Sequence, residues 1–332
     1  MINRLLVAVM ALAFGVLSFP PTIGAQEGKA GKVARIGRLS PLSAETDRPN
    51  LEAFRKGLRD LGWVEGQSFT IETRFADGKP ERLPALAAEL VRQRVDVILA
   101  GSTPGALAAK KATTTIPIVM VTTGDPVRDG LVPSLARPGG NLTGITALGQ
   151  ALDTKRLELI KEAVPGVTRV AVLVDPDSYY TALFLKEKEP AARRLAVELR
   201  LLEVRDPAAL EKALATLATE RIGALMVQTN ATFITHRNRI VALVAKNRLP
   251  AVYGDRTFVD AGGLMFYGAS LASLYGDAAV YTDKILKGAR PADLPVEQPT
   301  KLELIIILKT AKTLGMTLPP SLLARADHVV ER

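Results

Sequence analysis

The chain has 332 residues, of which 48% are hydrophobic and 23% charged, a balance that indicates a folded globular protein and excludes a disordered one. Cysteine is absent, which excludes disulfides, thiolate metal sites and cysteine nucleophiles; the two histidines, His236 and His328, lie far apart. The net charge is +9, but basic residues alternate with acids, as in Lys186–Glu189, so nucleic-acid binding is not expected. The length predicts two domains at about 150 residues each.

Residues 1–25 have the pattern of a secretory signal peptide. Arg4 precedes the apolar run Leu5–Phe19, and small residues follow up to Ala25. The run is shorter than the roughly 18 apolar residues of a membrane span. We therefore expect cleavage before Gln26 and an exported mature protein, periplasmic in a Gram-negative cell. The alternative is an uncleaved anchor helix.

The first half of the mature chain alternates short β-branched runs with helical patterns, which is typical of parallel βαβ units. The predicted strands are Val33–Leu39, Phe69–Arg74, Val95–Ala100, Pro117–Val121 and Leu142–Thr146. The predicted helices are Pro49–Leu61, Arg82–Arg92 and Gly105–Thr113.

The same order of elements restarts in the second half. The predicted strands are Arg169–Val174, Arg200–Val204, Ala224–Gln228, Ala251–Tyr253, Leu264–Tyr267 and Leu302–Leu308, and the predicted helices are Tyr180–Leu195, Pro207–Thr219, Thr235–Asn247 and Leu271–Lys287. The fold class is therefore α/β, with two doubly wound, Rossmann-like lobes, each with a flavodoxin-like parallel sheet. Lobe 1 is expected at residues 31–147 with about 265–291 crossing back, and lobe 2 at 148–264 with about 296–332. Several crossings between lobes would form a hinge.

Ligands of open parallel sheets bind beyond the carboxyl ends of the strands, where strand order reverses. In lobe 1 this places Ser40, Ser43 and the loop Gly101–Gly105 at the candidate site. Thr103 can cap the following helix and Pro104 can occupy its first position, which leaves N–H groups that attract a carboxylate or phosphate. Ordinary capping is the competing interpretation.

Other polar residues also follow predicted strands. The candidate ligand contacts in this group are Thr123, Asp125, Asp175, Tyr179, Asn230 and Asp255. Aromatic side chains there could enclose an apolar ligand, and Asp255 could pair with an amino group. Asp206-Pro207 follows a predicted edge strand and is most simply a helix cap, so Asp125 and Asp175, in similar Asp-Pro pairs, have the same alternative role.

Enzyme signatures are missing from the sequence. It contains neither a G-x-S-x-G nor a G-x-G-x-x-G motif, no phosphate-binding G-x-x-x-x-G-K-[ST], and no H-E-x-x-H. This favours binding over catalysis, with neither cofactor nor metal expected.

Three segments carry a resemblance to a known family: Glu81–Leu90, Leu135–Gly144 and Pro299–Leu304, the last continuing through Lys309–Lys312 to Leu318–Asp327. The chain resembles bacterial ABC transporter substrate-binding proteins of the tryptophan/tyrosine type, over nearly the whole mature chain. The resemblance implies a type I periplasmic-binding-protein fold with two hinged lobes crossed three times. It also implies a monomeric receptor that delivers an amino-acid-like solute, aromatic or branched, to an ABC permease and its ATPase. A ligand-sensing receptor and a secreted enzyme with the same cleft are the alternatives.

Overall fold

The computed structural model describes residues 33–177, 179–205, 207–217 and 220–331, so the expected signal peptide lies outside the described residues. Within that part, the first sheet is five-stranded and parallel, in the order β2-β1-β3-β4-β5. This is the predicted flavodoxin-like order, with the reversal between β1 and β3. The strands are β1 (Ala34–Ser40), β2 (Phe69–Phe75), β3 (Val97–Gly101), β4 (Ile118–Thr122) and β5 (Leu142–Thr146).

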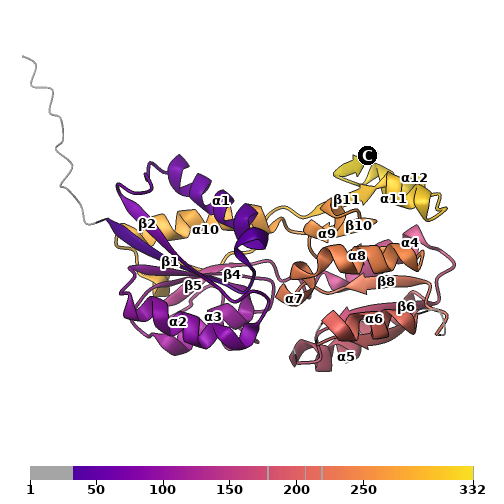
Figure 1. The fold of residues 1–332 in the computed structure, drawn as a ribbon, viewed down its shortest axis with the longest axis horizontal. Helices are drawn as coiled ribbons and strands as arrows, with labels where there is room; N and C mark the ends of the chain where they lie inside the picture. The colour runs from indigo at the N-terminus through magenta and orange to yellow at the C-terminus, as the bar shows by residue number, and fades with distance from the viewer. Residues whose placement is uncertain (1–32, 178, 206, 218–219, 332) are drawn as a thin grey trace, which may run out of the picture. The chain divides into compact units, whose positions relative to one another are not determined.

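Helices cover both faces of the first sheet (Figure 1). They are α1 (Ala44–Asp60) and α10 (Leu271–Leu286) on one face, and α2 (Leu83–Arg92) and α3 (Ser102–Ala112) on the other. Residues along each strand alternate between the two cores: Ile36 packs with α1 and α10, whereas Leu39 packs with α2 and α3. Helices α1 and α10 approach closely at Gly57, where an added Cβ would lie 2.7 Å from the Gly276 carbonyl oxygen.

The second sheet has seven strands within the described residues, in the order β12-β11-β10-β9-β8-β6-β7. Strands β6 to β10 are parallel and again follow the flavodoxin-like order, whereas β10 and β11 are antiparallel. The strands are β6 (Arg169–Val174), β7 (Glu198–Glu203), β8 (Ala224–Val227), β9 (Ala251–Tyr253), β10 (Met265–Gly268), β11 (Glu303–Ile307) and β12 (His328–Val330).

The second sheet is also covered on both faces, and its two cores are apolar. One core includes α6 (Pro207–Ala215), α7 (Ala231–Thr235), α8 (Arg237–Lys246) and α9 (Thr257–Asp260), and the other includes α4 (Asp153–Ala163), α5 (Tyr179–Arg194), α11 (Leu308–Thr313) and α12 (Pro320–Ala324). Short 3₁₀ turns lie at η1 (Pro80–Arg82) and η2 (Pro291–Asp293). In the described residues, no helix has both the length and the apolar character that a bilayer span requires.

The chain passes between the two sheets three times. Residues 147–152 lead from β5 to α4, and 269–270 return from β10 to α10, which packs on the first sheet. Before the third crossing, the Glu297 carbonyl accepts the Thr146 N–H of β5 at 2.9 Å. Residues 298–302 then lead to β11. Because β10 pairs with β9 and β11, the return to the first sheet begins after Gly268.

Candidate ligand-binding site

The two candidate serines after β1 make local hydrogen bonds. Ser40 is fully buried, and its hydroxyl oxygen accepts the Leu42 N–H at 3.2 Å. Ser43 is the N-cap of α1 and accepts the Thr46 N–H at 3.3 Å. Both side chains therefore shape the loop at the carboxyl end of β1.

The loop after β3 differs from the predicted arrangement at its helix start. Helix α3 begins at Ser102, three residues before the predicted start, so Pro104 is not its first residue. The N-cap position is Gly101, so no side chain caps the helix. Within the first turn Ser102 Oγ accepts the Gly105 N–H at 3.3 Å, while the Thr103 hydroxyl donates to Asp129 at 2.9 Å. Ser102 has φ 65°, in the left-handed region that side chains rarely adopt. The predicted capping by Thr103 was wrong, because the helix starts before Thr103 and its hydroxyl bonds to Asp129 instead.

The loop after β4 lies beside this helix start. Thr123 is half-buried, and its carbonyl accepts the Gly149 N–H at 2.7 Å. Asp125 accepts the N–H groups of Val127 and Arg128 at 3.0 and 3.2 Å, which is the local turn that this residue type favours. The side chain of Asp125 thus stabilises a turn and does not cap a helix, which was the alternative considered from the sequence.

A buried ion pair that the sequence reasoning missed lies beneath these loops. Arg38, on β1, donates to both carboxylate oxygens of Asp47 at 3.0 and 2.7 Å and to the Tyr275 hydroxyl at 2.8 Å. It also donates to the Leu39 and Leu99 carbonyls at 3.0 and 3.4 Å. Burial disfavours the charged guanidinium, but Asp47 and Tyr275 together outweigh burial and raise the pKa of Arg38. The available signal was the alternation along β1, which places Arg38 on the same face as the buried Ala34 and Ile36.

This cluster explains why Gly101 stands at the end of β3. A Cβ there would lie 2.6 Å from the Tyr275 hydroxyl and 2.9 Å from an Arg38 nitrogen. Burial raises the pKa of Tyr275 to about 12, so its hydroxyl keeps its proton at neutral pH. Arg38 and Tyr275 therefore set the position of the backbone that leads into α3.

The candidates after the strands of the second sheet also make local bonds. Asp175 accepts the Asp177 N–H at 3.0 Å, and burial raises the pKa of Asp175. Asn230 is the N-cap of α7 and accepts the Phe233 N–H at 2.7 Å. Helix α5 begins at Tyr179, whose side chain lies outside the described part of the structure.

Asp255 is the most buried of the predicted acidic contacts, with 3% of its surface exposed. It accepts the Thr257 N–H at 2.9 Å and the Thr257 hydroxyl, yet burial still raises its pKa. Tyr253 is buried against Phe258, with ring centroids 4.8 Å apart. It therefore belongs to the core of the second sheet.

Four buried side-chain atoms have no hydrogen-bond partner among the described residues: Thr122 Oγ1, Gln150 Oε1, Gln228 Nε2 and Gln93 Oε1. Gln93 follows α2, away from the carboxyl ends of the strands. Thr122 ends β4, Gln228 follows β8, and Gln150 lies in the first crossing between the sheets. An unpaired buried polar group costs about 1–3 kcal/mol. Three such atoms near the predicted ligand edges are candidate contacts that sequence reasoning missed.

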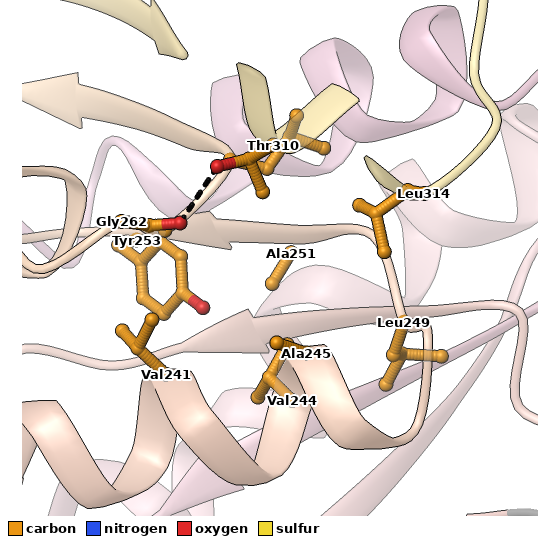
Figure 2. Close-up of a pocket in the computed structure, with 11 residues that line it drawn as sticks. Val241, Val244, Ala245, Leu249, Ala251, Tyr253, Gly262, Thr310 and Leu314 are labelled. Carbon is orange, nitrogen blue, oxygen red and sulfur yellow. Dashed lines mark hydrogen bonds between the residues drawn. The ribbon is translucent and has the colours of Figure 1, made fainter. Parts of the chain in front are cut away.

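Two pockets of the described structure lie away from these loops. One is between α8, β9 and α11, where Val241, Leu249 and Leu314 contribute apolar side chains and the Thr310 hydroxyl donates to the Gly262 carbonyl (Figure 2). Its volume of about 10 Å³ matches a single water. A second, of about 250 Å³, is lined by Lys110 and the Pro138–Leu142 turn. Within the described ranges, no three His, Cys, Asp or Glu side chains are grouped for metal binding.

Two doubly wound sheets with three crossings and polar carboxyl edges define a two-lobed solute-binding protein of the type I periplasmic-binding-protein fold. The profile of one family, described as ABC transporter substrate binding protein, matches residues 36–330. The chain therefore belongs to the ABC transporter substrate-binding protein family. Its members are binding proteins, so the enzyme alternative is set aside.

Relatives agree with this assignment. A tyrosine-binding protein of Clostridioides difficile is 28% identical over 83% of this chain and 80% of its own length. The structure of an ABC domain in complex with L-Trp from Streptococcus pneumoniae is similar over 90% of this chain and 100% of that chain, with 25% identity and a TM-score of 0.81. The dimeric Lac repressor shares the fold at 15% identity, over 81% of this chain and 96% of that chain, with a TM-score of 0.55.

Proposed function

We propose that this chain is the exported, periplasmic receptor of an ABC importer and that it captures an aromatic amino acid. The three unpartnered buried atoms of Thr122, Gln150 and Gln228 carry the proposal, because a bound ligand would satisfy them. The relatives support the aromatic class, since one is named for tyrosine and another was solved with L-Trp. The captured solute passes to the permease and ATPase, and the receptor acts as a monomer.

The ligand contacts in this proposal come from the loops at the carboxyl edges of both sheets. They are the sequence-predicted residues Ser40, Ser43, Gly101, Ser102, Thr103, Thr123, Asp125, Asp175, Tyr179, Asn230 and Asp255, together with Thr122, Gln150 and Gln228. The start of α3 suits the ligand carboxylate, because the amino end of a helix favours an anion. A ligand held by both edges favours the closed state, so binding shifts the population toward closure.

The deciding experiment is calorimetry with L-tyrosine and L-tryptophan on protein refolded to remove carried ligand. L-lysine and D-tryptophan are the controls. We expect saturable binding of an L-aromatic amino acid, with a stability gain of about 2.7 kcal/mol at a hundredfold excess over Kd. Equal affinity for L-lysine, or the absence of binding by both aromatic amino acids, would overturn the proposed ligand class.

Export has a separate test. Mass analysis of the protein from the periplasmic fraction should give a chain that begins at Gln26. An intact chain from Met1 in the membrane fraction would support the anchor-helix alternative.

A further inference from the structure

A second buried guanidinium, that of Arg156, joins parts of the chain that lead to different sheets. Arg156 is on α4 and has 2% of its surface exposed. It pairs with Asp153 at 2.7 Å, so its charge is balanced within the same helix. Its other hydrogen bonds go to two backbone carbonyls, those of Gly149 and Tyr267, each at 2.8 Å.

One of these carbonyls lies in a crossing and the other just before one. Gly149 is within the crossing 147–152, and Tyr267 is in β10, two residues before the crossing 269–270. A buried hydrogen bond to a charged group contributes more than a neutral one. Arg156 therefore ties the first crossing to the end of β10, where the second crossing begins.

Gly149 is held from both directions. Its N–H donates to the Thr123 carbonyl, which follows β4 of the first sheet, at 2.7 Å, and its own carbonyl accepts from Arg156. The attachment of the chain thus changes from the first sheet to the second within this one residue. Leu148, directly before it, has φ 42°, in the left-handed region.

The surroundings leave the guanidinium little room to move. A Cβ on Gly254 would lie 3.1 Å from Arg156 Cζ, and a Cβ on Gly268 would lie 3.3 Å from Arg156 Nη2. The Tyr180 hydroxyl is placed to donate to Asp153 at 3.3 Å and to the Gln150 carbonyl, in the first crossing, at 3.2 Å. The Arg156–Asp153 pair is thus packed between glycine backbone and the first crossing.

We propose that Arg156 is the positioning residue of the hinge: it fixes the first crossing, at Gly149, to the end of β10 and thereby confines the closing rotation to Gly149 and to the residues between Tyr267 and α10. This rests on the closure in the proposed function. Loss of the anchor lets the crossings rotate at additional bonds, so the ligand-free receptor samples more arrangements and fewer of them can bind.

Because the chain has no cysteine, two cysteines can be introduced and spin-labelled without labelling any other residue. The labels replace Lys56 on α1 and Arg193 on α5, whose side chains are 69% and 75% exposed. Pulsed electron-spin resonance then gives the distribution of label distances with and without L-tryptophan. We expect Arg156→Met to broaden the ligand-free distribution and to weaken L-tryptophan binding by about tenfold, as fewer molecules are competent. Arg156→Lys, which retains one carbonyl bond, should be intermediate.

A second variant keeps the test decisive if Arg156→Met does not fold. Arg156→Met combined with Asp153→Leu replaces the whole ion pair by apolar side chains, a change that buried pairs often tolerate. Arg35→Met is the matched control. Arg35 also donates to a backbone carbonyl, that of Gln93 at 2.6 Å, but both residues belong to the first sheet and its helices and neither lies in a crossing. An unbroadened distribution in the folded double variant would overturn the proposal. Failure of the wild type to bind either aromatic amino acid would overturn only the ligand class, since the ligand-free distributions still test Arg156.

Discussion

Arg38 and Asp47 form an ion pair with two hydrogen bonds, at 3.0 and 2.7 Å, in which neither side chain has exposed surface. Asn50 also donates to Asp47, at 3.2 Å. The pair joins β1 to the first turns of α1 and reaches α10 through Tyr275. A helix that returns from the second sheet is thereby tied to the strand below the candidate ligand loops.

Asp47→Asn should lower the free energy of unfolding by about 3–5 kcal/mol, because it leaves the Arg38 charge buried without a counter-ion. Urea unfolding measures the loss. Asp60→Asn is the control: Asp60 pairs with Lys56 at 2.5 Å, but both side chains are more than half exposed, so the cost should stay below about 1 kcal/mol. Similar losses in the two variants would show that burial of the pair is not what matters.

Thr122→Val should weaken L-tryptophan binding by about tenfold while leaving the ligand-free protein as stable as the wild type or more so. The reason is that the buried hydroxyl has no partner in the described structure, and valine has the same shape. Thr143→Val, on the neighbouring strand, is the control, since its hydroxyl donates to the Leu294 carbonyl at 2.6 Å. That change should cost about 1–3 kcal/mol of stability. Calorimetry and thermal unfolding check both, and a Thr122→Val protein with wild-type affinity would remove Thr122 from the site.

Ser102→Ala should reduce stability by about 1 kcal/mol, because the Gly105 N–H in the first turn of α3 loses its acceptor. It should also weaken L-tryptophan binding by roughly tenfold to a hundredfold, if the hydroxyl proton is donated to the ligand carboxylate. Ser68→Ala removes a comparable bond, from the Val64 N–H at 2.8 Å, before β2 at the opposite edge of the sheet. It should leave affinity unchanged. Equal affinities of the two variants would limit the role of Ser102 to the first turn of α3.

Asp255→Asn should change how stability depends on pH. Burial raises the pKa of Asp255, so the folded protein binds a proton there more tightly than the unfolded chain does. The wild type therefore gains stability as pH falls through the raised pKa toward the ordinary aspartate value of about 3.9, and asparagine gains none. Urea unfolding of both proteins between pH 7 and pH 4 measures the difference. A difference that stays constant with pH would contradict the prediction.

The parallel strands could be predicted from the sequence because β-branched runs between turn residues occur mainly in strands. Leu142–Thr146 and Arg169–Val174 are strands with the predicted bounds. Helix α1 was predicted to begin at Pro49, but Ser43 caps it and Pro49 lies inside. The strand β11 was predicted, as Leu302–Leu308, but its antiparallel direction was not, because strand direction depends on tertiary pairing. The three-residue β12 was missed because a strand this short carries no periodicity.

The candidate site could be predicted less well, for a chemical reason. Serine, asparagine and aspartate that bind ligands are the same residues that cap helices, and Ser43, Asn230 and Asp255 all make such local bonds here. Arg38 and Arg156 pair with acids that are near in the sequence, Asp47 and Asp153. Their other partners include carbonyls of distant segments, those of Leu99 and Tyr267. The near pairs do not reveal this burial, because charged residues close in the sequence are also common on exposed surfaces.

The three crossings have a consequence for the order in which the two cores fold. The first sheet needs α10, so its core cannot close until residue 286 has been synthesised, and the second sheet needs β11 and β12 near the end of the chain. Domains with contiguous sequence can fold one after another. Here each core includes segments that lie on both sides of the other lobe's residues or far along the chain, so we expect the two cores to fold together rather than in sequence.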